Sequence, residues 1–397
     1  MSTFQSRRDQ FDLPEGITYL DGNSLGPLPK AAVERARQTM ADEWGPMLIT
    51  GWNKAKWMEL PGRLGDRIGK LIGAPAGSTM VGDTLSIKVY QAVASAVEMR
   101  PGRKMVLSDN GNFPSDLYIA DGLLKSLGQG HELKVVDPEA VVDHITEDVA
   151  AVMLTHVDYR TGRVHDMKAI TDKAHAVGAL MIWDLAHSAG ALPVDLSGCN
   201  ADIAVGCTYK YLNGGPGAPG FIYVRPELIE QVRPALSGWL GHQAPFAFDL
   251  DYRPGDGISR MRVGTPPVIQ MAVLDAALDA FEGVDMNDIR ARSIELSEQF
   301  ISEVEAGCKD VELASPRDPN ARGSQVSFRF HEGYAGMQAL IARGIIGDFR
   351  APDIMRFGFC PLYNTSDEVS HAASALCEII ATGEWDKPEF KARKAVT

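Results

Sequence analysis

The sequence predicts an α/β fold with a mostly parallel sheet and flanking helices, followed by a smaller C-terminal α+β domain. From about residue 78 to 225, apolar runs of strand length alternate with helical patterns, an order typical of parallel α/β sheets. After Pro266-Pro267 the order changes to a long helical pattern followed by strands. A chain of 397 residues is long enough for both units. We expect an N-terminal segment (1–50), a large domain (51–265) and a small domain (266–397).

The expected strands of the large domain are six short apolar runs. They begin at Lys104, Glu132, Ala150, Leu180, Asp202 and Phe221. The stretch from Met167 to Val177 has apolar residues at helical spacing, so we expect a crossover helix there.

The C-terminal part has a different order. A helical pattern from about Val268 to Ala306 precedes strands near Val311-Glu-Leu and at Gln325–Phe330, and a further helix from Ala335 to Arg343. We expect the N-terminal pair Tyr19-Leu20 to pack with this part or on the domain interface.

Composition excludes several classes of partner. The 39 basic and 52 acidic residues give a net charge of −13, with the acids dispersed along the chain. A nucleic-acid partner is therefore not expected, because neutralising phosphates requires a basic face. The five cysteines are scattered and lack the CxxC spacing of a zinc or redox site. We expect no metal site and reduced thiols.

The sequence also predicts a cytoplasmic location. The first residues, MSTFQSRRDQFDLPEG, lack the apolar core of a signal peptide. No run approaches the ~20 apolar residues that cross a bilayer. We therefore expect a soluble enzyme with no membrane partner.

Two polar residues that follow predicted strands can face one pocket. Asp184 follows the run Ala179–Trp183, and Lys210 follows Ile203–Gly206. The 17 residues from Leu185 to Ala201 suffice for a crossover between parallel strands, which needs about a dozen. Ligands of such sheets bind at the carboxyl ends of the strands. A lysine that binds an aldehyde and a carboxylate that binds a pyridinium nitrogen are what a pyridoxal phosphate enzyme must supply.

The glycine-rich stretch after Lys210 matches a known motif by sequence but not by structural context. Gly215-Pro-Gly-Ala-Pro-Gly220 matches GxGxxG, the dinucleotide fingerprint of dehydrogenases. That fingerprint opens a helix whose amides meet the pyrophosphate, whereas here two prolines interrupt it and a strand-like run follows. We interpret the glycines as a tight turn that leaves room for a cofactor.

Six motifs, in order and across essentially the whole chain, resemble the kynureninase family. They are Tyr19–Gly26, Asn112–Asp116, Trp183–His187, Thr208–Asn213, Ser237–His242 and Pro361–Asn364. The wider class is the fold-type I pyridoxal phosphate enzymes, close to the class V aminotransferases and cysteine desulfurases. The resemblance implies hydrolysis of L-kynurenine to anthranilate and L-alanine, in tryptophan catabolism and, in some organisms, in NAD biosynthesis.

The resemblance also implies roles for individual residues. Lys210 would bind the cofactor aldehyde and act as the base at Cα, Asp184 would pair with the pyridine nitrogen, and Tyr209 would relay protons. Phe113 would stack on the cofactor ring, with Ser115, Asp116 and His187 close by. Trp239 and Thr265 would reach the phosphate from a second subunit, which implies a homodimer.

Thr84 and Leu85 are the expected phosphate site. They precede a helical pattern, and the amides at a helix N-terminus suit an anion. An ordinary helix cap is the alternative interpretation of Thr84.

The resemblance implies a substrate site as well. Arg356 matches the family's carboxylate-binding arginine, whose fork binds a carboxylate at two points. Ser24, Trp52 and Thr265 would lie near the aryl end. The animal enzymes carry His and Asn where this chain has Trp52 and Thr265, so we expect kynurenine to be preferred over 3-hydroxykynurenine.

Other functions share parts of this pattern. A cysteine desulfurase needs a reactive cysteine on a loop before the carboxylate-binding arginine, and Ser324–Met355 contains none. An aminotransferase would also fit the residues that are expected to bind the cofactor. A non-catalytic paralogue acting as a binding subunit would have little reason to keep both Lys210 and Asp184.

Overall fold

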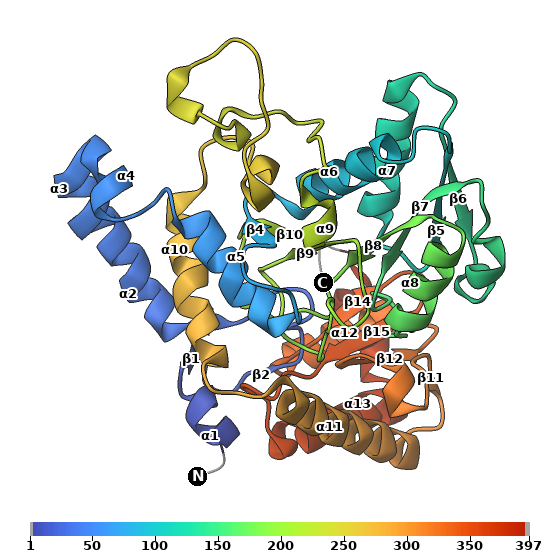
Figure 1. Ribbon diagram of the computed structural model, residues 1–397. Coiled ribbons are helices and arrows are strands. Elements are labelled where there is room, and N and C mark those ends of the chain that lie inside the picture. Colours follow the sequence, from blue (N-terminus) through green and yellow to red (C-terminus); the bar gives the residue numbers. More distant parts are fainter. Residues whose placement is uncertain (1–2, 394–397) are drawn as a thin grey trace.

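A seven-stranded sheet forms the centre of the larger part of the molecule. The computed structural model describes residues 3–393, and Figure 1 shows this part above a smaller one. The strands run in the order β4-β10-β9-β8-β7-β5-β6. Their bounds are β4 (Thr79–Val81), β5 (Met105–Asp109), β6 (Glu132–Val136), β7 (Val149–Thr155), β8 (Leu180–Asp184), β9 (Ile203–Cys207) and β10 (Gly220–Val224). β10 runs antiparallel to both of its neighbours, β4 and β9, and the other neighbouring strands of this sheet pair in parallel. The predicted mostly parallel sheet is therefore confirmed.

The central strands are buried on both faces of the sheet. In β7, Val152 and Leu154 belong to one apolar cluster while Ala151 and Met153 belong to another, because successive side chains of a strand point to opposite faces. The helices of this part are α5 (Leu60–Leu71), α6 (Leu85–Glu98), α7 (Pro114–Leu127), α8 (Met167–Ala176), α9 (Pro226–Ile229) and α10 (Val268–Ala277). The expected helix near Met167–Val177 is thus present, and Asp166 caps it by accepting from the Ala169 amide at 2.9 Å.

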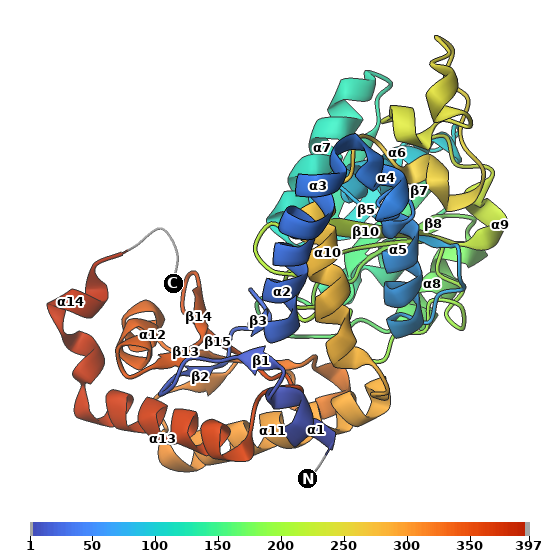
Figure 2. The ribbon, with the colours of Figure 1, turned by 90° about the vertical axis from the view of Figure 1, so that its left-hand side faces the viewer.

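The smaller part is an antiparallel sheet covered by helices (Figure 2). The strand order is β11-β12-β15-β14, with bounds β11 (Glu312–Leu313), β12 (Gln325–Arg329), β14 (Asp348–Arg350) and β15 (Ile354–Gly358). Its helices are α11 (Met286–Gly307), α12 (Gly333–Ala342), α13 (Ser366–Thr382) and α14 (Pro388–Lys391). The N-terminal strand β2 (Thr18–Tyr19) pairs in parallel with β13 (Ile345–Ile346), which places Tyr19 beside this part.

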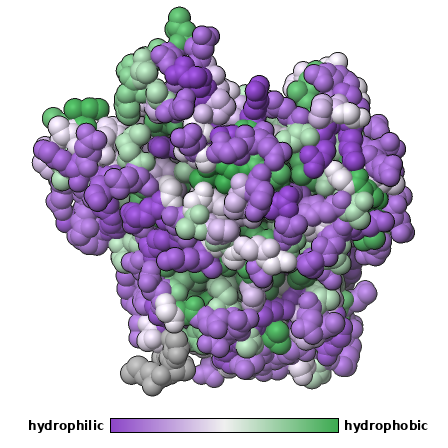
Figure 3. Space-filling model, viewed as in Figure 1, coloured by the Kyte–Doolittle hydropathy of each residue, from purple (hydrophilic) through white to green (hydrophobic). Residues whose placement is uncertain are grey.

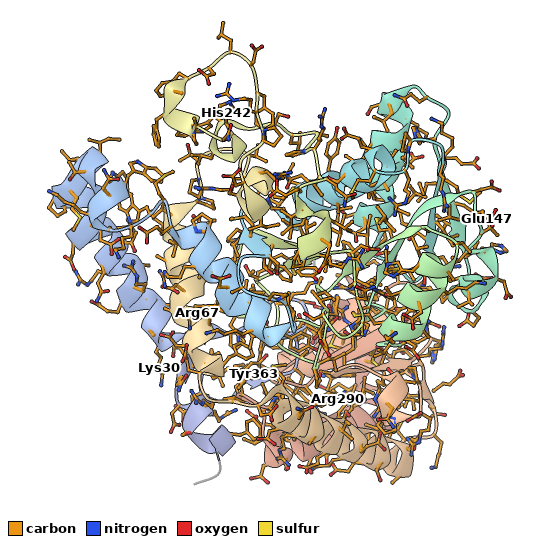
Figure 4. All side chains as sticks on the ribbon, in the orientation of Figure 1. Lys30, Arg67, Glu147, His242, Arg290 and Tyr363 are labelled. Carbon is orange, nitrogen blue, oxygen red and sulfur yellow. The ribbon has the colours of Figure 1, made fainter. Side chains whose placement is uncertain are left out.

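The helical pattern from Val268 to Ala306 is broken in the structure. A 3-10 turn (Leu278–Phe281) ends α10, Gly283 adopts a φ of +69°, and Asp285 caps the start of α11. Continuous helical spacing hid this break, because both helices are apolar on one side. Arg67 of α5 bonds Asp275 of α10 at 2.8 Å (Figure 4), so α10 packs beside α5. The boundary near residue 265 remains a prediction.

Two segments project from the larger part and carry exposed apolar side chains. One runs from α2 (Lys30–Gln38) through α3 (Gly45–Met47) to α4 (Gly51–Lys54), where Ile49 is 77% exposed. The other is the loop around His242, where Phe248 is 75% exposed. Figure 3 shows apolar surface at the tips of both. Among residues 3–393, no helix combines the length and apolarity needed to cross a membrane.

Candidate active site

A cavity of about 130 Å³ lies where the parallel strands end. It is lined by the end of β8, the turn after β9 and the first residues of α6 and α7. Nine residues predicted from the sequence line it: Thr84, Leu85, Phe113, Ser115, Asp116, Asp184, His187, Tyr209 and Lys210. Asp184 and Lys210 therefore face one pocket, as the crossover between β8 and β9 requires.

Lys210 is held on the turn that follows β9. Its Nζ lies 2.9 Å from Nε2 of His187, and 5.9 Å from the ring centroid of Phe113. The N-terminal segment fastens this turn, because the Gly26 amide donates to the Tyr209 carbonyl at 2.8 Å. A Cβ on Gly26 would lie 2.4 Å from the Lys210 carbonyl oxygen, so a side chain there would push the lysine turn out of place.

Two buried carboxyl groups face this lysine. Asp184 accepts from the Ala186 amide at 2.9 Å, and burial raises its pKa to about 6 against the opposing effect of Lys210. Burial and the charge of Asp184 raise the pKa of Asp116 well above its usual range. Oδ2 of Asp116 has no hydrogen-bond partner among the described residues. Lys210 favours the ionised form of Asp184, so this carboxyl group suits a cationic ring nitrogen.

His187 and Tyr209 also have defined protonation states. Burial, followed by the positive charges of Lys210 and Arg356, lowers the pKa of His187 well below its usual range, so this imidazole is neutral. The neighbouring Cys207 and burial raise the pKa of Tyr209 above its usual range. Tyr209 therefore keeps its phenolic proton at neutral pH and can donate it.

Two helices begin at the cavity. Thr84 caps α6, its Oγ1 accepting from the Ile87 amide at 3.4 Å, and α7 begins at Pro114. The hydroxyl oxygens of Ser86 and Ser115, one from each helix, lie 3.5 Å apart. The first amides of a helix have no acceptor within the helix, so two helix ends together suit a phosphate.

These features fit pyridoxal phosphate. A lysine amine, a carboxylate with a raised pKa, an aromatic ring and two helix N-termini are the groups that its aldehyde, ring nitrogen, ring face and phosphate require. All of them line one cavity.

Arg356 and Ser24 lie together beside this cavity. Arg356 of β15 is 1% exposed, and its Nη2 donates to Ser24 Oγ at 2.7 Å. The same guanidinium donates to the carbonyl of Tyr159, a residue that lines the cavity. It also pairs with Asp348, whose Oδ1 lies 2.8 Å from Nε.

Sequence reasoning missed Asp348 and Tyr159. The available signal for Asp348 was strand alternation, which places Asp348 and Arg350 on one face of a short strand. That strand, β14, pairs with β15 so that Asp348 is opposite Arg356. No local pattern marks Tyr159.

Besides Ser24 and Arg356, three predicted residues do not line the cavity within one chain. Trp239 lies in the loop that contains His242 and is 43% exposed, and Thr265 is exposed. Trp52 belongs to α4, where its ring packs edge-on against Trp57 with centroids 5.6 Å apart. Figure 1 shows α4 far from β8. The roles of all three remain predictions that depend on a second chain.

Comparisons with known proteins identify relatives of this chain. Residues 289–376 match the kynureninase C-terminal domain family. The chain is 49% identical to a kynureninase of Pseudomonas fluorescens and 48% identical to one of Burkholderia pseudomallei (strain 1106a). Each comparison covers 98% of this chain and 95% of the relative.

Solved structures share the fold. A cysteine desulfurase of Thermococcus onnurineus NA1 aligns with a TM-score of 0.80 at 19% identity, over 96% of this chain and 99% of the other. A C-DES mutant with glycine covalently linked to its PLP cofactor aligns with a TM-score of 0.78 at 20% identity, over 94% and 99%. The architecture is thus that of fold-type I enzymes. Because nearly half of the residues are identical to those of curated kynureninases along almost the whole length, the chain belongs to the kynureninase family.

Proposed function

We propose that this protein is a pyridoxal phosphate-dependent hydrolase that cleaves L-kynurenine to anthranilate and L-alanine. The observation that carries the proposal is one cavity in which Lys210 lies 2.9 Å from a neutral His187 and faces Asp184. The relatives named kynureninase support the choice of reaction.

When bound at this site, pyridoxal phosphate supplies an aldehyde that takes up an amine and a conjugated ring that accepts electrons. Lys210 Nζ would hold the aldehyde at rest and later hold the proton taken from the substrate Cα. Asp184 would keep a proton on the ring nitrogen, which favours acceptance of electrons by the ring. Phe113 would pack against the face of the ring.

The substrate carboxylate would bind beside the guanidinium groups of Arg350 and Arg356, which share Asp348 as their partner. Arg350 Nη2 lies 2.6 Å from Asp348 Oδ2, and Arg356 pairs with the same side chain. Burial and the charge of Asp348 raise the pKa of the neighbouring Asp21 to about 7. When Asp21 is protonated, the two guanidinium groups and the Asp348 carboxylate together carry one net positive charge. One substrate carboxylate would neutralise that charge.

Tyr209 would complete the proton transfers. Its raised pKa keeps the proton on its hydroxyl, and the centroid of its ring lies 5.8 Å from the Lys210 Nζ. A neutral phenol at that place would donate to the product, while neutral His187 would accept a hydrogen bond from the lysine.

The desulfurase alternative lacks its nucleophile. Cys360, the cysteine nearest Arg356 in sequence, is 1% exposed, and burial raises the pKa of its thiol to about 12. A thiol in that state is a poor nucleophile. The aminotransferase alternative would be detected by pyruvate or a second keto acid acting as the amino acceptor.

We propose a homodimer with shared active sites. The two projecting segments expose Ile49 and Phe248, and apolar side chains exposed in this way mark protein interfaces. Trp239 and Thr265 would then reach the partner's phosphate site, and Trp52 would approach the aryl end there. Trp52 and Thr265, both expected near the aryl end of the substrate, have few polar atoms to bind a ring hydroxyl. We therefore expect kynurenine to be preferred over 3-hydroxykynurenine.

We assign the reaction to tryptophan catabolism, with a place in NAD biosynthesis where that route exists, and to the cytoplasm. All five cysteines are free, which suits a reducing compartment. The test of the proposed function is anthranilate fluorescence after kynurenine is added to the purified protein with pyridoxal phosphate. Fluorescence equal to that of a blank would contradict it.

A further inference from the structure

A buried lysine lies directly behind the turn that opens α6. Lys88 is 0% exposed, and its Nζ lies 3.0 Å from Asp83 Oδ2, 3.0 Å from Gln91 Oε1 and 3.1 Å from the Met261 carbonyl oxygen. An ammonium group has three protons to donate, so three acceptors satisfy it. Lysines are almost never fully buried unless paired. Lys88 does not line the cavity and takes no part in the chemistry above.

Its ionic partner has an unusual backbone conformation. Asp83 has a φ of +55°, in the left-handed region that residues with a Cβ rarely adopt. The carbonyl of Asp83 accepts from the Gly220 amide at 2.9 Å. The pair with Lys88 therefore holds this left-handed residue in place immediately before Thr84 and Leu85.

The turn has little freedom to move on its other side. A Cβ on Gly220 would lie 2.8 Å from the Leu85 amide nitrogen and 3.0 Å from the Thr84 carbonyl carbon, so the backbone of β10 packs directly against the turn. Burial lowers the pKa of Lys88 and the charge of Asp83 opposes that shift. Asp83 thus favours the charged form of the lysine.

We propose that Lys88 is a positioning residue for the cofactor phosphate: through Asp83 it fixes the direction of the amides at the start of α6. The proposal rests on the function proposed above. Lys88 also holds the Met261 carbonyl, four residues before Thr265. One buried ammonium thus connects the phosphate turn of α6 with the segment proposed to reach the partner's phosphate.

The test compares binding of pyridoxal phosphate and of pyridoxal, which lacks the phosphate, to apoprotein. Lys88→Met removes the ammonium and keeps most of the side-chain volume. Its dissociation constant for pyridoxal phosphate should rise roughly tenfold or more, the cost of a lost charged hydrogen bond, while that for pyridoxal should change less than about threefold. Absorbance of the lysine-bound aldehyde reports both.

A second pair of variants keeps the test decisive if Lys88→Met fails to fold. Asp83→Ala should show the same selective loss, whereas Asp83→Asn should retain affinity, because asparagine tolerates a positive φ and its amide oxygen accepts from Lys88. Val89→Ala is the matched control: it is a neighbouring buried residue of α6 that packs in the apolar core. It should lower the melting temperature without changing the ratio of the two affinities.

The outcomes separate the two proposals. The role of Lys88 alone would be overturned if the wild-type protein binds pyridoxal phosphate but the variants lose affinity for both compounds equally, or for neither. Wild-type protein that binds neither compound would overturn the proposed function and this role with it.

Discussion

The Arg356 guanidinium and the Asp348 carboxylate form a two-point ion pair in which Nε lies 2.8 Å from Oδ1. Both side chains are 1% exposed. Arg356 therefore cannot turn freely toward a substrate, and Asp348 sets the direction of its remaining donors. Those donors reach Ser24 and Tyr159 at the edge of the cavity.

Asp348→Ala should weaken substrate binding and spare cofactor binding. With Arg356 no longer oriented, KM for kynurenine should rise roughly tenfold or more, while the dissociation constant for pyridoxal phosphate stays near that of wild type. Steady-state kinetics and an absorbance titration measure the two quantities. Arg329→Ala, which removes an exposed arginine of the same sheet paired with Asp353, serves as the control. Loss of cofactor affinity in Asp348→Ala would contradict the assigned substrate role.

Asp184 and Asp116 should differ in their response to amide substitution. Removing one partner of a buried charge pair costs about 3 kcal/mol or more, so Asp184→Asn should lower kcat roughly 100-fold or more. Burial and the charge of Asp184 raise the pKa of Asp116 well above its usual range, which favours its protonated form. Asn is a close match to a neutral carboxyl group, so the loss for Asp116→Asn should be about tenfold or less. Equal losses in kcat for the two variants would argue against the assigned charge states.

The affinity for the cofactor should fall at acidic pH. The pKa of Asp184 is raised from 3.8 to about 6 in the folded protein, so the ionised form that pairs with a pyridinium is lost below pH 6. The apparent dissociation constant for pyridoxal phosphate should then rise about tenfold per pH unit. Asp184→Asn should show no such change between pH 4 and 6.

The same shift has the opposite effect on the stability of the apoprotein. Because the folded state binds a proton that the unfolded state releases, the contribution of Asp184 to folding free energy is fully present below pH 3.8 and is lost as pH rises through 6. Melting temperatures of wild-type and Asp184→Asn apoprotein across this range measure it.

Mixed dimers test the shared active site. Lys210→Ala removes the lysine proposed to bind the cofactor, and Trp239→Ala removes the aromatic residue proposed to reach the partner's site. When the two inactive proteins are mixed in equal amounts and allowed to exchange subunits, half of the dimers carry one intact site. Activity should then return to roughly a quarter of wild type. No recovery despite demonstrated exchange would contradict the shared site.

The cofactor half of the site was predictable from sequence because its signals are local. Asp184 and Lys210 each follow a buried strand, and parallel strands bring such positions to one edge. Thr84 lies at a recognisable helix start. These residues required only the order of strands and helices, which apolar periodicity indicates.

Other features depend on contacts between distant segments. Asp348 is opposite Arg356 only because β14 pairs with β15, and Ser24 reaches both from the N-terminal segment. The break before α11 depends on Gly283 and Asp285, which a continuous apolar spacing conceals. No local pattern marks Lys88 as buried, and only the fold brings the Met261 carbonyl to it.

The proposed reaction is tested most directly by anthranilate release. Wild-type protein with pyridoxal phosphate and L-kynurenine should produce anthranilate fluorescence and an equal amount of L-alanine, and it should show the visible absorbance of a lysine-bound aldehyde. Lys210→Ala should show neither that absorbance nor turnover, with a melting temperature that confirms folding. Sustained anthranilate release by folded Lys210→Ala, or none from the wild-type protein, would contradict the assignment.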